Sequence, residues 1–313
     1  MPKWSISEMP DQSGKIAIVT GANSGLGYES AQALVRKGAH VVIACRNQTK
    51  AAVAYDQLEA CTPEPSLDSI PLDLSNLDSV RAFAEAFTAK YDRLDILLNN
   101  AGVMAPPRGE TTDGYEMQFG TNHLGHFALT GLLMPTLLAT PGSRVVTVTS
   151  FANLMGRINF DDLQSKGTYT RYGAYGQSKL ANLLFALELQ RRLEAAGADT
   201  ISVAAQPGLA HTNLQSNTVE ASGNAAEGRL YGMVMGTLSM TAEEGALPQL
   251  YAATMPDVVG GQYYSPNFLY FRGSPTTIAI PPQARSRETA ARLWAVSEEL
   301  TGVVYPLPEP ASA

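Results

Sequence analysis

Between Lys15 and Gly27 the chain reads KIAIVTGANSGLG, a short apolar run that ends in a glycine-rich turn. Unbroken apolar runs of this length are typical of strands that are buried on both faces of a parallel sheet. The glycines permit a tight turn and let backbone N–H groups approach a diphosphate at the start of a following helix. The spacing G-x-x-x-G-x-G differs from the general G-x-G-x-x-G motif, and no G-K-[ST] follows, so a dinucleotide is favoured over ATP. The residues predicted to bind it here are Gly21, Asn23, Ser24, Gly25, Leu26 and Gly27.

Apolar runs and helix-like stretches continue to alternate beyond this turn. Strands are predicted at residues 15–20, 40–45, 69–72, 94–98, 144–149, 201–205 and 262–265. Strand–helix–strand units imply right-handed crossovers, so we expect a single-domain α/β protein. Its core would be a Rossmann-type, doubly wound parallel sheet with helices on both faces. Residues 1–13 are predicted as an N-terminal tail, 209–240 as a small substrate-binding insertion and 285–301 as a C-terminal helix.

Composition excludes several classes of protein. Only 16% of the 313 residues are charged, 45% are hydrophobic and the net charge is −7. Such an acidic chain lacks the clustered cations that nucleic acids require, so no nucleic-acid partner is expected. The two cysteines form no disulfide framework and have no metal-ligand spacing. Neither a signal peptide nor a membrane span is evident, and we expect a cytoplasmic protein.

The end of the second predicted strand indicates which dinucleotide binds. NAD-dependent enzymes place Asp or Glu there to bond the ribose 2′-hydroxyl. Here the residues are Cys45 and Arg46, and no carboxylate is present. An acid would repel a 2′-phosphate, whereas the guanidinium of Arg46 can form a forked pair with it. The sequence therefore predicts NADP(H) as the cofactor.

A tyrosine and a lysine four residues apart are the candidate acid–base pair. Among the 13 tyrosines only Tyr175 has a lysine at this spacing, Lys179. The pair opens a helix that follows the fifth strand, near Ser150 at the carboxyl edge of the sheet. A neighbouring cation lowers the pKa of a phenol by favouring the phenolate, and Ser150 could hold a substrate oxygen beside it.

Six motifs in order resemble the short-chain dehydrogenase/reductase family over about residues 14–215. They are the glycine turn, Asp73-Leu74, Asn99-Asn100-Ala101-Gly102, Asn122 with its neighbours, the Ser150/Tyr175/Lys179 set and Pro207-Gly208. The stretches NHLGHF at 122–127 and SKLAN at 178–182 resemble the retinol dehydrogenase and protochlorophyllide reductase branch, as does the 25-residue separation of Ser150 and Tyr175.

This resemblance implies a complete site. Asn122, Ser150, Tyr175 and Lys179 would form the catalytic tetrad, with Asn122 holding a water that connects Lys179 to solvent. Cofactor contacts would come from Asp73 and Leu74 at the adenine, Asn100, Ala101 and Gly102 at the adenosine ribose, Tyr175 and Lys179, Pro207 and Gly208, and Thr212 at the nicotinamide carboxamide. Members of the family commonly pair through the helices at about 115–138 and 175–193, so the resemblance is compatible with a homodimer or homotetramer, and the sequence leaves the oligomeric state open.

The predicted activity is interconversion of an alcohol and an aldehyde or ketone, in the manner of a carbonyl reductase. Because the insertion is rich in Leu and Met and has one basic residue, Arg229, we expect a lipophilic, uncharged substrate. Three alternatives remain open. They are a light-dependent protochlorophyllide reductase, a non-catalytic NADP-binding sensor or scaffold, and an epimerase or dehydratase of the extended relatives.

Two histidines three residues apart, His123 and His126, have a spacing that is compatible with a metal. No third ligand is evident, so packing or polar anchoring is favoured and no metal is predicted.

Overall fold

The core of the computed structural model is one eight-stranded sheet, and the structure describes residues 4–209 and 240–307. Its strand order is β3-β2-β1-β4-β5-β6-β7-β8. Strands β1 to β7 are parallel and β8 is antiparallel to β7. The strands are β1 (Ile16–Thr20), β2 (His40–Cys45), β3 (Leu67–Pro71), β4 (Ile96–Asn99), β5 (Arg144–Val148), β6 (Ile201–Ala205), β7 (Tyr263–Phe268) and β8 (Arg272–Thr277). The predicted doubly wound α/β sheet is therefore confirmed.

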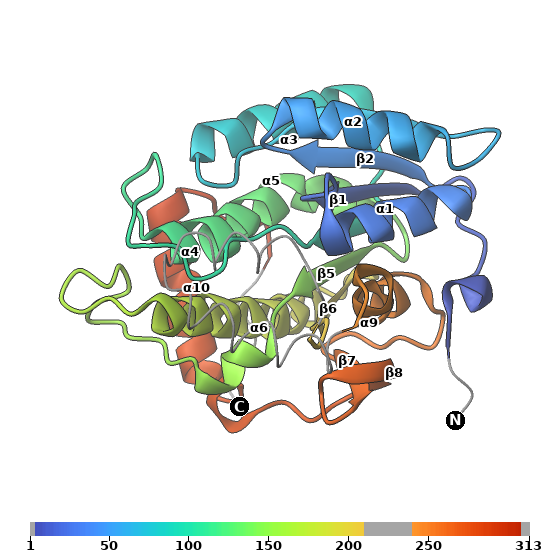
Figure 1. Cartoon of the computed structure of the whole chain (residues 1–313). Coiled ribbons are helices and arrows are strands. Elements are labelled where there is room, and N and C mark those ends of the chain that lie inside the picture. The colour runs from blue at the N-terminus through green and yellow to red at the C-terminus, as the bar shows by residue number, and fades with distance from the viewer. Residues whose placement is uncertain (1–3, 210–239, 308–313) are drawn as a thin grey trace, which may run out of the picture.

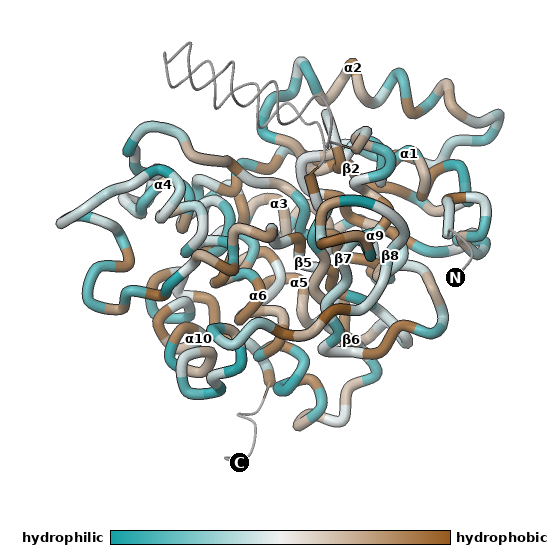
Figure 2. Tube along the Cα trace, turned by 60° about the horizontal axis from the view of Figure 1, so that its bottom comes forward, coloured by the Kyte–Doolittle hydropathy of each residue, from teal (hydrophilic) through white to brown (hydrophobic). Residues whose placement is uncertain are grey.

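Helices cover both faces of the sheet (Figure 1). Helices α1 (Gly25–Arg36), α2 (Gln48–Glu59) and α9 (Ala242–Thr254) pack on one face. The other face carries α3 (Leu77–Lys90), α5 (Gly125–Ala139), α6 (Arg171–Ala195) and α10 (Arg287–Thr301). Shorter elements are η1 (Ile6–Glu8), α4 (Met117–Phe119), the π-helical turn η2 (Gly120–Leu124), η3 (Phe151–Met155) and η4 (Pro282–Ala284). Hydrophobic residues concentrate along the central strands, while many outer loops are hydrophilic (Figure 2).

The predicted strands agree closely with the observed ones. Predictions at 40–45 and 201–205 match β2 and β6 at both ends, and the other five overlap their strands within one to three residues. Strand β8 was not predicted. Its sequence, RGSPTT, contains Gly273 and Pro275, which are depleted in strands, and it has no apolar run.

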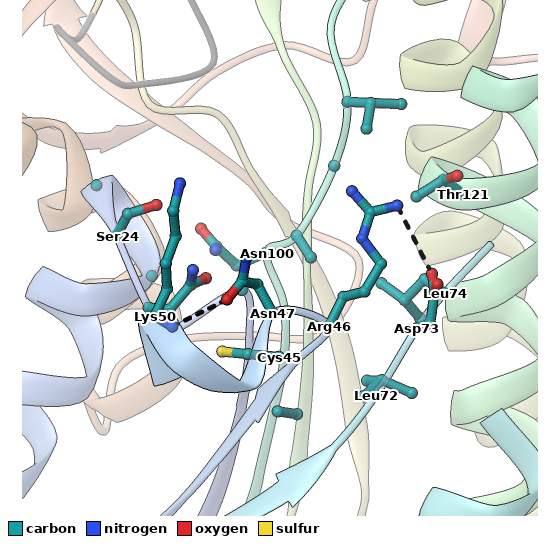
Figure 3. Close-up of a pocket in the computed structure, with 18 of the residues that line it drawn as sticks. Ser24, Cys45, Arg46, Asn47, Lys50, Leu72, Asp73, Leu74, Asn100 and Thr121 are labelled. Atoms are coloured by element: carbon teal, nitrogen blue, oxygen red, sulfur yellow. Dashed lines mark hydrogen bonds and ion pairs between the residues drawn. The ribbon is translucent and has the colours of Figure 1, made fainter. Parts of the chain in front are cut away.

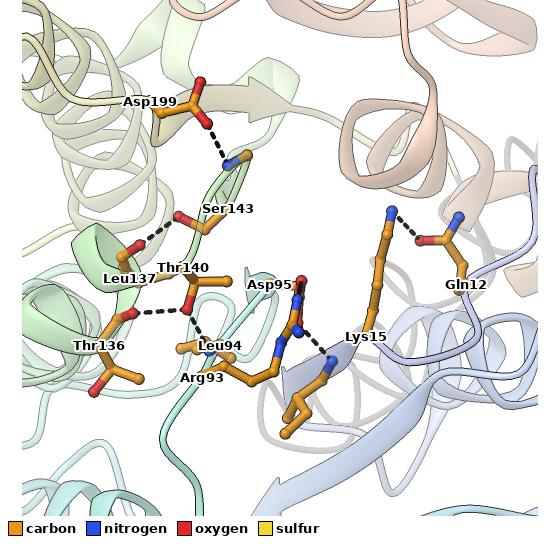
Figure 4. A network of polar contacts seen from close by, with 12 residues as sticks. Gln12, Lys15, Arg93, Leu94, Asp95, Thr136, Leu137, Thr140, Ser143 and Asp199 are labelled. Atoms are coloured by element: carbon orange, nitrogen blue, oxygen red, sulfur yellow. Dashed lines mark hydrogen bonds and ion pairs between the residues drawn. The ribbon is translucent and has the colours of Figure 1, made fainter.

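Polar contacts close the amino edge of the sheet (Figure 4). The carboxylate of Asp95 accepts the backbone N–H of Ile16 at 2.9 Å and is paired with Arg93. Nearby, the backbone N–H of Leu94 donates to the Thr140 hydroxyl at 3.0 Å. These bonds satisfy backbone groups where β1 and β4 begin. The opposite, carboxyl edge is where doubly wound sheets bind ligands.

The N-terminal segment contacts the core. Trp4, within the predicted N-terminal tail, is buried and stacks edge-on against Tyr251 of α9. The predicted insertion lies mostly outside the described residues, which include only its ends. At those ends the Met240 N–H donates to the Leu209 carbonyl at 2.7 Å, so the segment leaves and re-enters the fold at one point.

No helix within residues 4–209 and 240–307 is long and apolar enough to cross a membrane.

Candidate active site

A cleft of about 450 Å³ lies at the carboxyl ends of β1, β2 and β4 (Figure 3). Twelve of the predicted cofactor residues line it. They are Gly21, Asn23, Ser24, Gly25, Leu26, Gly27, Arg46, Asp73, Leu74, Asn100, Ala101 and Gly102. The sheet order explains this convergence, because β1 lies between β2 and β4 and the loops that follow all three strands meet above it.

The glycine positions in the turn at the base of this cleft do not favour larger residues. Gly21 and Gly25 have φ of 70° and 54°, in the left-handed region that favours glycine. A Cβ added to Gly27 would lie 2.3 Å from the Gly21 carbonyl oxygen and 2.6 Å from Nδ2 of Asn100. Helix α1 therefore starts close against the turn, and its first residues line the cleft, where the N-terminus of a helix can hold a diphosphate. The residues present fit a dinucleotide.

Two cations extend into the cleft from either side of Asn47 (Figure 3). Arg46 follows β2, and its nearest carboxylate is Asp73 at 4.0 Å. That ion pair is long and the Arg46 side chain is 64% exposed, so its guanidinium can reach another anion. Lys50 lies in the first turn of α2 and was not predicted. The sequence feature that could have indicated Lys50 is Asn47, the N-cap of the helix. Its side chain accepts the Lys50 N–H at 2.9 Å, which holds Lys50 at the cleft.

Other lining residues were also missed by sequence reasoning. They are Ala44, Asn47, Leu72, Val103, Met104, Pro106 and Thr121. The thiol of Cys45 is buried, and burial raises its pKa to about 11. Because a thiol with so high a pKa is protonated at neutral pH, Cys45 contributes no negative charge where an NAD-dependent enzyme has its acid.

The predicted catalytic lysine is buried on α6. Its Nζ lies 5.7 Å from the ring centre of Tyr175 and donates to the Val148 carbonyl at 3.3 Å. Burial lowers the pKa of Lys179 to about 8. A Cβ placed on Gly102 would be 3.6 Å from this Nζ, so the lysine lies directly beyond the inner wall of the cleft. Ser150 follows the end of β5 and caps η3, where its Oγ accepts the Ala152 N–H.

Asn122 lies at the centre of the π-helical turn η2. Its Oδ1 accepts the Val103 N–H at 2.7 Å, and its Nδ2 donates to the Val103 carbonyl and to Oγ of Ser178, both at 2.9 Å. Both amide protons are thus engaged by protein groups. The expected role of Asn122 in holding a water therefore falls to its oxygens, of which Oδ1 also faces Gly102.

The remaining predicted residues lie elsewhere. Pro207 and Gly208 follow β6 and do not line the cleft. Gly208 has φ of 70°, and a Cβ there would lie 2.4 Å from the Phe271 carbonyl oxygen, so this glycine permits close packing on the β7–β8 hairpin. Thr212 lies outside the described residues.

The two histidines, His123 and His126, have separate hydrogen-bond partners. Nε2 of His123 bonds Oγ of Ser297 on α10 at 2.9 Å, whereas His126 bonds groups near the cleft. Within the described ranges no three His, Cys, Asp or Glu side chains come together in a way that could hold a metal ion.

The fold and this arrangement define a Rossmann-type oxidoreductase that binds a nicotinamide cofactor. A family model described as short chain dehydrogenase matches residues 15–223, and the chain belongs to that family.

Named relatives share most of the chain. Mouse retinol dehydrogenase 12 is 40% identical over 294 residues, which are 93% of this chain and 88% of that protein. A crystal structure of an uncharacterized protein from Mycobacterium paratuberculosis is 41% identical, with a TM-score of 0.81 over 97% of this chain and all of that one. The active-site complex of Pseudomonas aeruginosa RhlG with NADP is 26% identical, with a TM-score of 0.64 over 81% of this chain and 94% of that one.

Proposed function

We propose that this protein is an NADP(H)-dependent carbonyl reductase that interconverts an alcohol and an aldehyde or ketone. The observation that carries the proposal is the buried Lys179 ammonium, 5.7 Å from the Tyr175 ring, at the inner end of a cleft that fits a dinucleotide. A cation held beside a phenol favours the phenolate, which makes the tyrosine an acid–base group near neutral pH.

Each catalytic side chain then has a distinct task. When bound, the nicotinamide cofactor supplies the hydride. Ser150 donates a hydrogen bond to the substrate oxygen, where negative charge develops in the transition state. Tyr175 transfers a proton to that oxygen, and the charge of Lys179 stabilises the phenolate that remains. Asn122 holds the loop after β4 through its two bonds to Val103, so the wall beside Lys179 keeps its shape.

Preference for NADP(H) is supported by the charges in the outer cleft. Arg46 and Lys50 are both cleft residues, and no acid ends β2. A 2′-phosphate would meet two cations there, which outweigh the single carboxylate of Asp73. The RhlG complex contains NADP, which is consistent with this cofactor for a related chain.

A lipophilic substrate is supported by a second cavity beside Ser150. Its volume is about 220 Å³. Most of its lining is apolar, including Phe151, Leu154, Tyr263, Tyr270, Ile278 and Ile280, while Gln206 and Arg285 are its polar members. Phe151 directly follows Ser150 in the chain and stacks edge-on against Phe271. Retinol, named for the mouse relative, is itself a lipophilic alcohol. An apolar tail on the substrate would find matching surface here.

The test is a panel of aldehydes and ketones, followed by loss of NADPH absorbance. We expect kcat/KM to be higher with NADPH than with NADH, and higher for an acetophenone than for a 2-oxo acid of similar size. Along an alkyl series each added methylene should contribute up to about 0.8 kcal/mol of apolar contact. A preference for NADH contradicts the cofactor assignment, and a preference for the charged oxo acid contradicts the substrate class.

A further inference from the structure

A chain of hydrogen bonds connects the cofactor cleft to the turn that contains Asn122, and His126 is its central member. The His126 side chain is 1% exposed and comes from the first turn of α5. Its Nδ1 lies 2.9 Å from the Asn122 carbonyl oxygen, and its Nε2 lies 3.0 Å from Oγ1 of Thr20. One imidazole therefore contacts both the catalytic turn and the last residue of β1.

The direction of these bonds follows from the tautomer. Burial lowers the pKa of His126 to about 4, so the ring is neutral and carries one N–H. A carbonyl oxygen only accepts, so Nδ1 must be the donor to Asn122, and Nε2 must accept. The Thr20 hydroxyl is then the donor to Nε2, which leaves its 3.3 Å contact with the Leu98 carbonyl as the weaker alternative.

On the cleft side, the oxygen of Thr20 is an acceptor for two backbone groups. The N–H groups of Asn100 and Ala101 both donate to Oγ1 at 2.9 Å, and Nδ2 of Asn100 donates to the Thr20 carbonyl at 2.9 Å. These bonds fix the turn after β4 against the glycine turn, and both turns line the cleft. A Cβ on Gly27 would lie 2.6 Å from Nδ2 of Asn100, so these two turns pack closely against each other.

On the catalytic side, the bond from His126 fixes a backbone that is not an ordinary helix. A π-helical turn leaves backbone groups displaced from the i−4 pattern, and such turns are frequent at functional sites. The imidazole donates a hydrogen bond to the Asn122 carbonyl, while the Asn122 side chain bonds Val103 and Ser178. The position of Asn122 is thereby set from both its backbone and its side chain.

We propose that His126 is a positioning residue that couples the cofactor cleft to the Asn122 turn. Its Nε2 holds Thr20 and through it the turn at Asn100 and Ala101, and its Nδ1 holds the backbone of Asn122. It touches neither substrate nor cofactor, and it acts through these two partners. The assignment rests on the proposed function for its effect on turnover, but not for its effect on NADPH binding.

Two variants separate the two bonds. In His126→Asn the side-chain amide can reach the position of Nδ1 but not that of Nε2, so the contact with Thr20 is lost. In His126→Gln the amide can reach the position of Nε2, so the contact with the Asn122 carbonyl is lost. His123→Asn is the matched control, because it also removes one hydrogen bond of a buried histidine, the bond from His123 to Ser297 on α10.

The measurements are the Kd of NADPH from its fluorescence, kcat at saturating NADPH, and Tm. Loss of one buried bond corresponds to about a tenfold change. We expect His126→Asn to raise Kd about tenfold with kcat retained, and His126→Gln to lower kcat about tenfold with Kd retained. His123→Asn should lower Tm without moving either constant.

The proposal is overturned if both His126 variants change Kd and kcat in the same proportion, or if they change only Tm as the control does. A further rise in Kd when His126→Asn is added to Thr20→Val also counts against it, because Thr20→Val has already removed the hydroxyl that bonds Nε2 of His126. Should the wild-type protein bind NADPH but reduce no carbonyl, the proposed function fails, while the Kd comparison still tests the link to Thr20.

Discussion

Nζ of Lys179 lies 5.7 Å from the ring centre of Tyr175, one turn further along α6. The lysine is 4% exposed, and burial lowers its pKa to about 8. Its charge is therefore present at neutral pH in a low-dielectric setting, where its influence on a nearby phenol is stronger than in water.

Replacing Tyr175 by Phe keeps the ring and removes the transferable proton. We expect kcat to fall by about a hundredfold or more, with the Kd of NADPH retained. Steady-state assays with NADPH and an aryl ketone measure kcat, and fluorescence titration measures the Kd of NADPH. Tyr172→Phe is the control, since that side chain is on the same helix and 48% exposed. Near-normal turnover of Tyr175→Phe would remove this residue from the mechanism.

An acid at the end of β2 should change the coenzyme preference. Cys45→Asp introduces a carboxylate where an NAD-dependent enzyme has one, next to Arg46. It should repel a 2′-phosphate and bond a 2′-hydroxyl, so the ratio of kcat/KM for NADPH over NADH should fall by about tenfold or more. Cys45→Ser, of similar size and uncharged, should keep the wild-type ratio. An unchanged ratio in Cys45→Asp would show that residue 45 does not contact the ribose.

Sequence periodicity was sufficient for the parallel core because its strands are continuous apolar runs. Strands β2 and β6 were predicted to the residue for this reason. The prediction at 69–72 missed the first residues of β3 because Leu67 and Asp68 gain strand structure from pairing with Val41 and Val42. Such pairing is a tertiary effect that no local pattern contains.

In the candidate site too, local motifs were predictable from the sequence and tertiary contacts were not. Residues in motifs with a fixed relation to a strand end, such as Gly27 and Asn100, line the cleft. Lys50 was missed, because its position depends on how α2 is oriented after β2. The bonds of Asn122 to Val103 connect residues 19 apart, and their pairing follows from the π-helical turn and not from any spacing.

The missed hairpin offers a test of local strain. Leu269 and Tyr270 occupy the turn between β7 and β8 with φ of 50° and 66°. Left-handed backbone is costly for side chains of this kind, about 1 kcal/mol or more per residue, and Asn-Gly is the favoured pair in such turns. The double variant Leu269→Asn/Tyr270→Gly should therefore raise the free energy of unfolding by about 1–2 kcal/mol, measured by urea denaturation. The control is Leu154→Asn, at an exposed apolar position outside this turn, which should not raise the free energy of unfolding. A lower stability of the double variant would show that contacts of the Leu269 and Tyr270 side chains outweigh the backbone strain.

Two buried histidines should make the protein sensitive to acid. Burial lowers the pKa of His123 to about 3 and that of His126 to about 4, from 6.5. Below about pH 6.5 the unfolded chain takes up protons that the folded chain excludes, so stability falls as pH decreases toward 4. His123→Phe removes one such group and should reduce this slope by up to about 1.4 kcal/mol per pH unit. Urea unfolding at pH 7.5, 6, 5 and 4.5 checks it; parallel curves for the two proteins would contradict the expectation.

Helix α10 covers the helices through which relatives are expected to pair. Trp294 of α10 lies 5.1 Å from Phe127 of α5 and 5.9 Å from Phe185 of α6, measured between ring centres. The guanidinium of Arg192 stacks on the same indole at 4.4 Å, and the Tyr305 hydroxyl donates to the Phe127 carbonyl at 2.6 Å. This face of α5 and α6 is therefore already buried within one chain.

We expect no assembly through α5 and α6, because a second copy would first have to displace α10 and its aromatic contacts. Light scattering should give the mass of one chain, 33.3 kDa. If a larger species forms through another surface, a cysteine at Leu138, an exposed position on α5, should not cross-link between copies. Efficient disulfide formation at that position would show that these helices meet across an interface. A cysteine at Val259, an exposed position between α9 and β7, measures cross-linking by random collision, and Leu138→Cys should match this background rate.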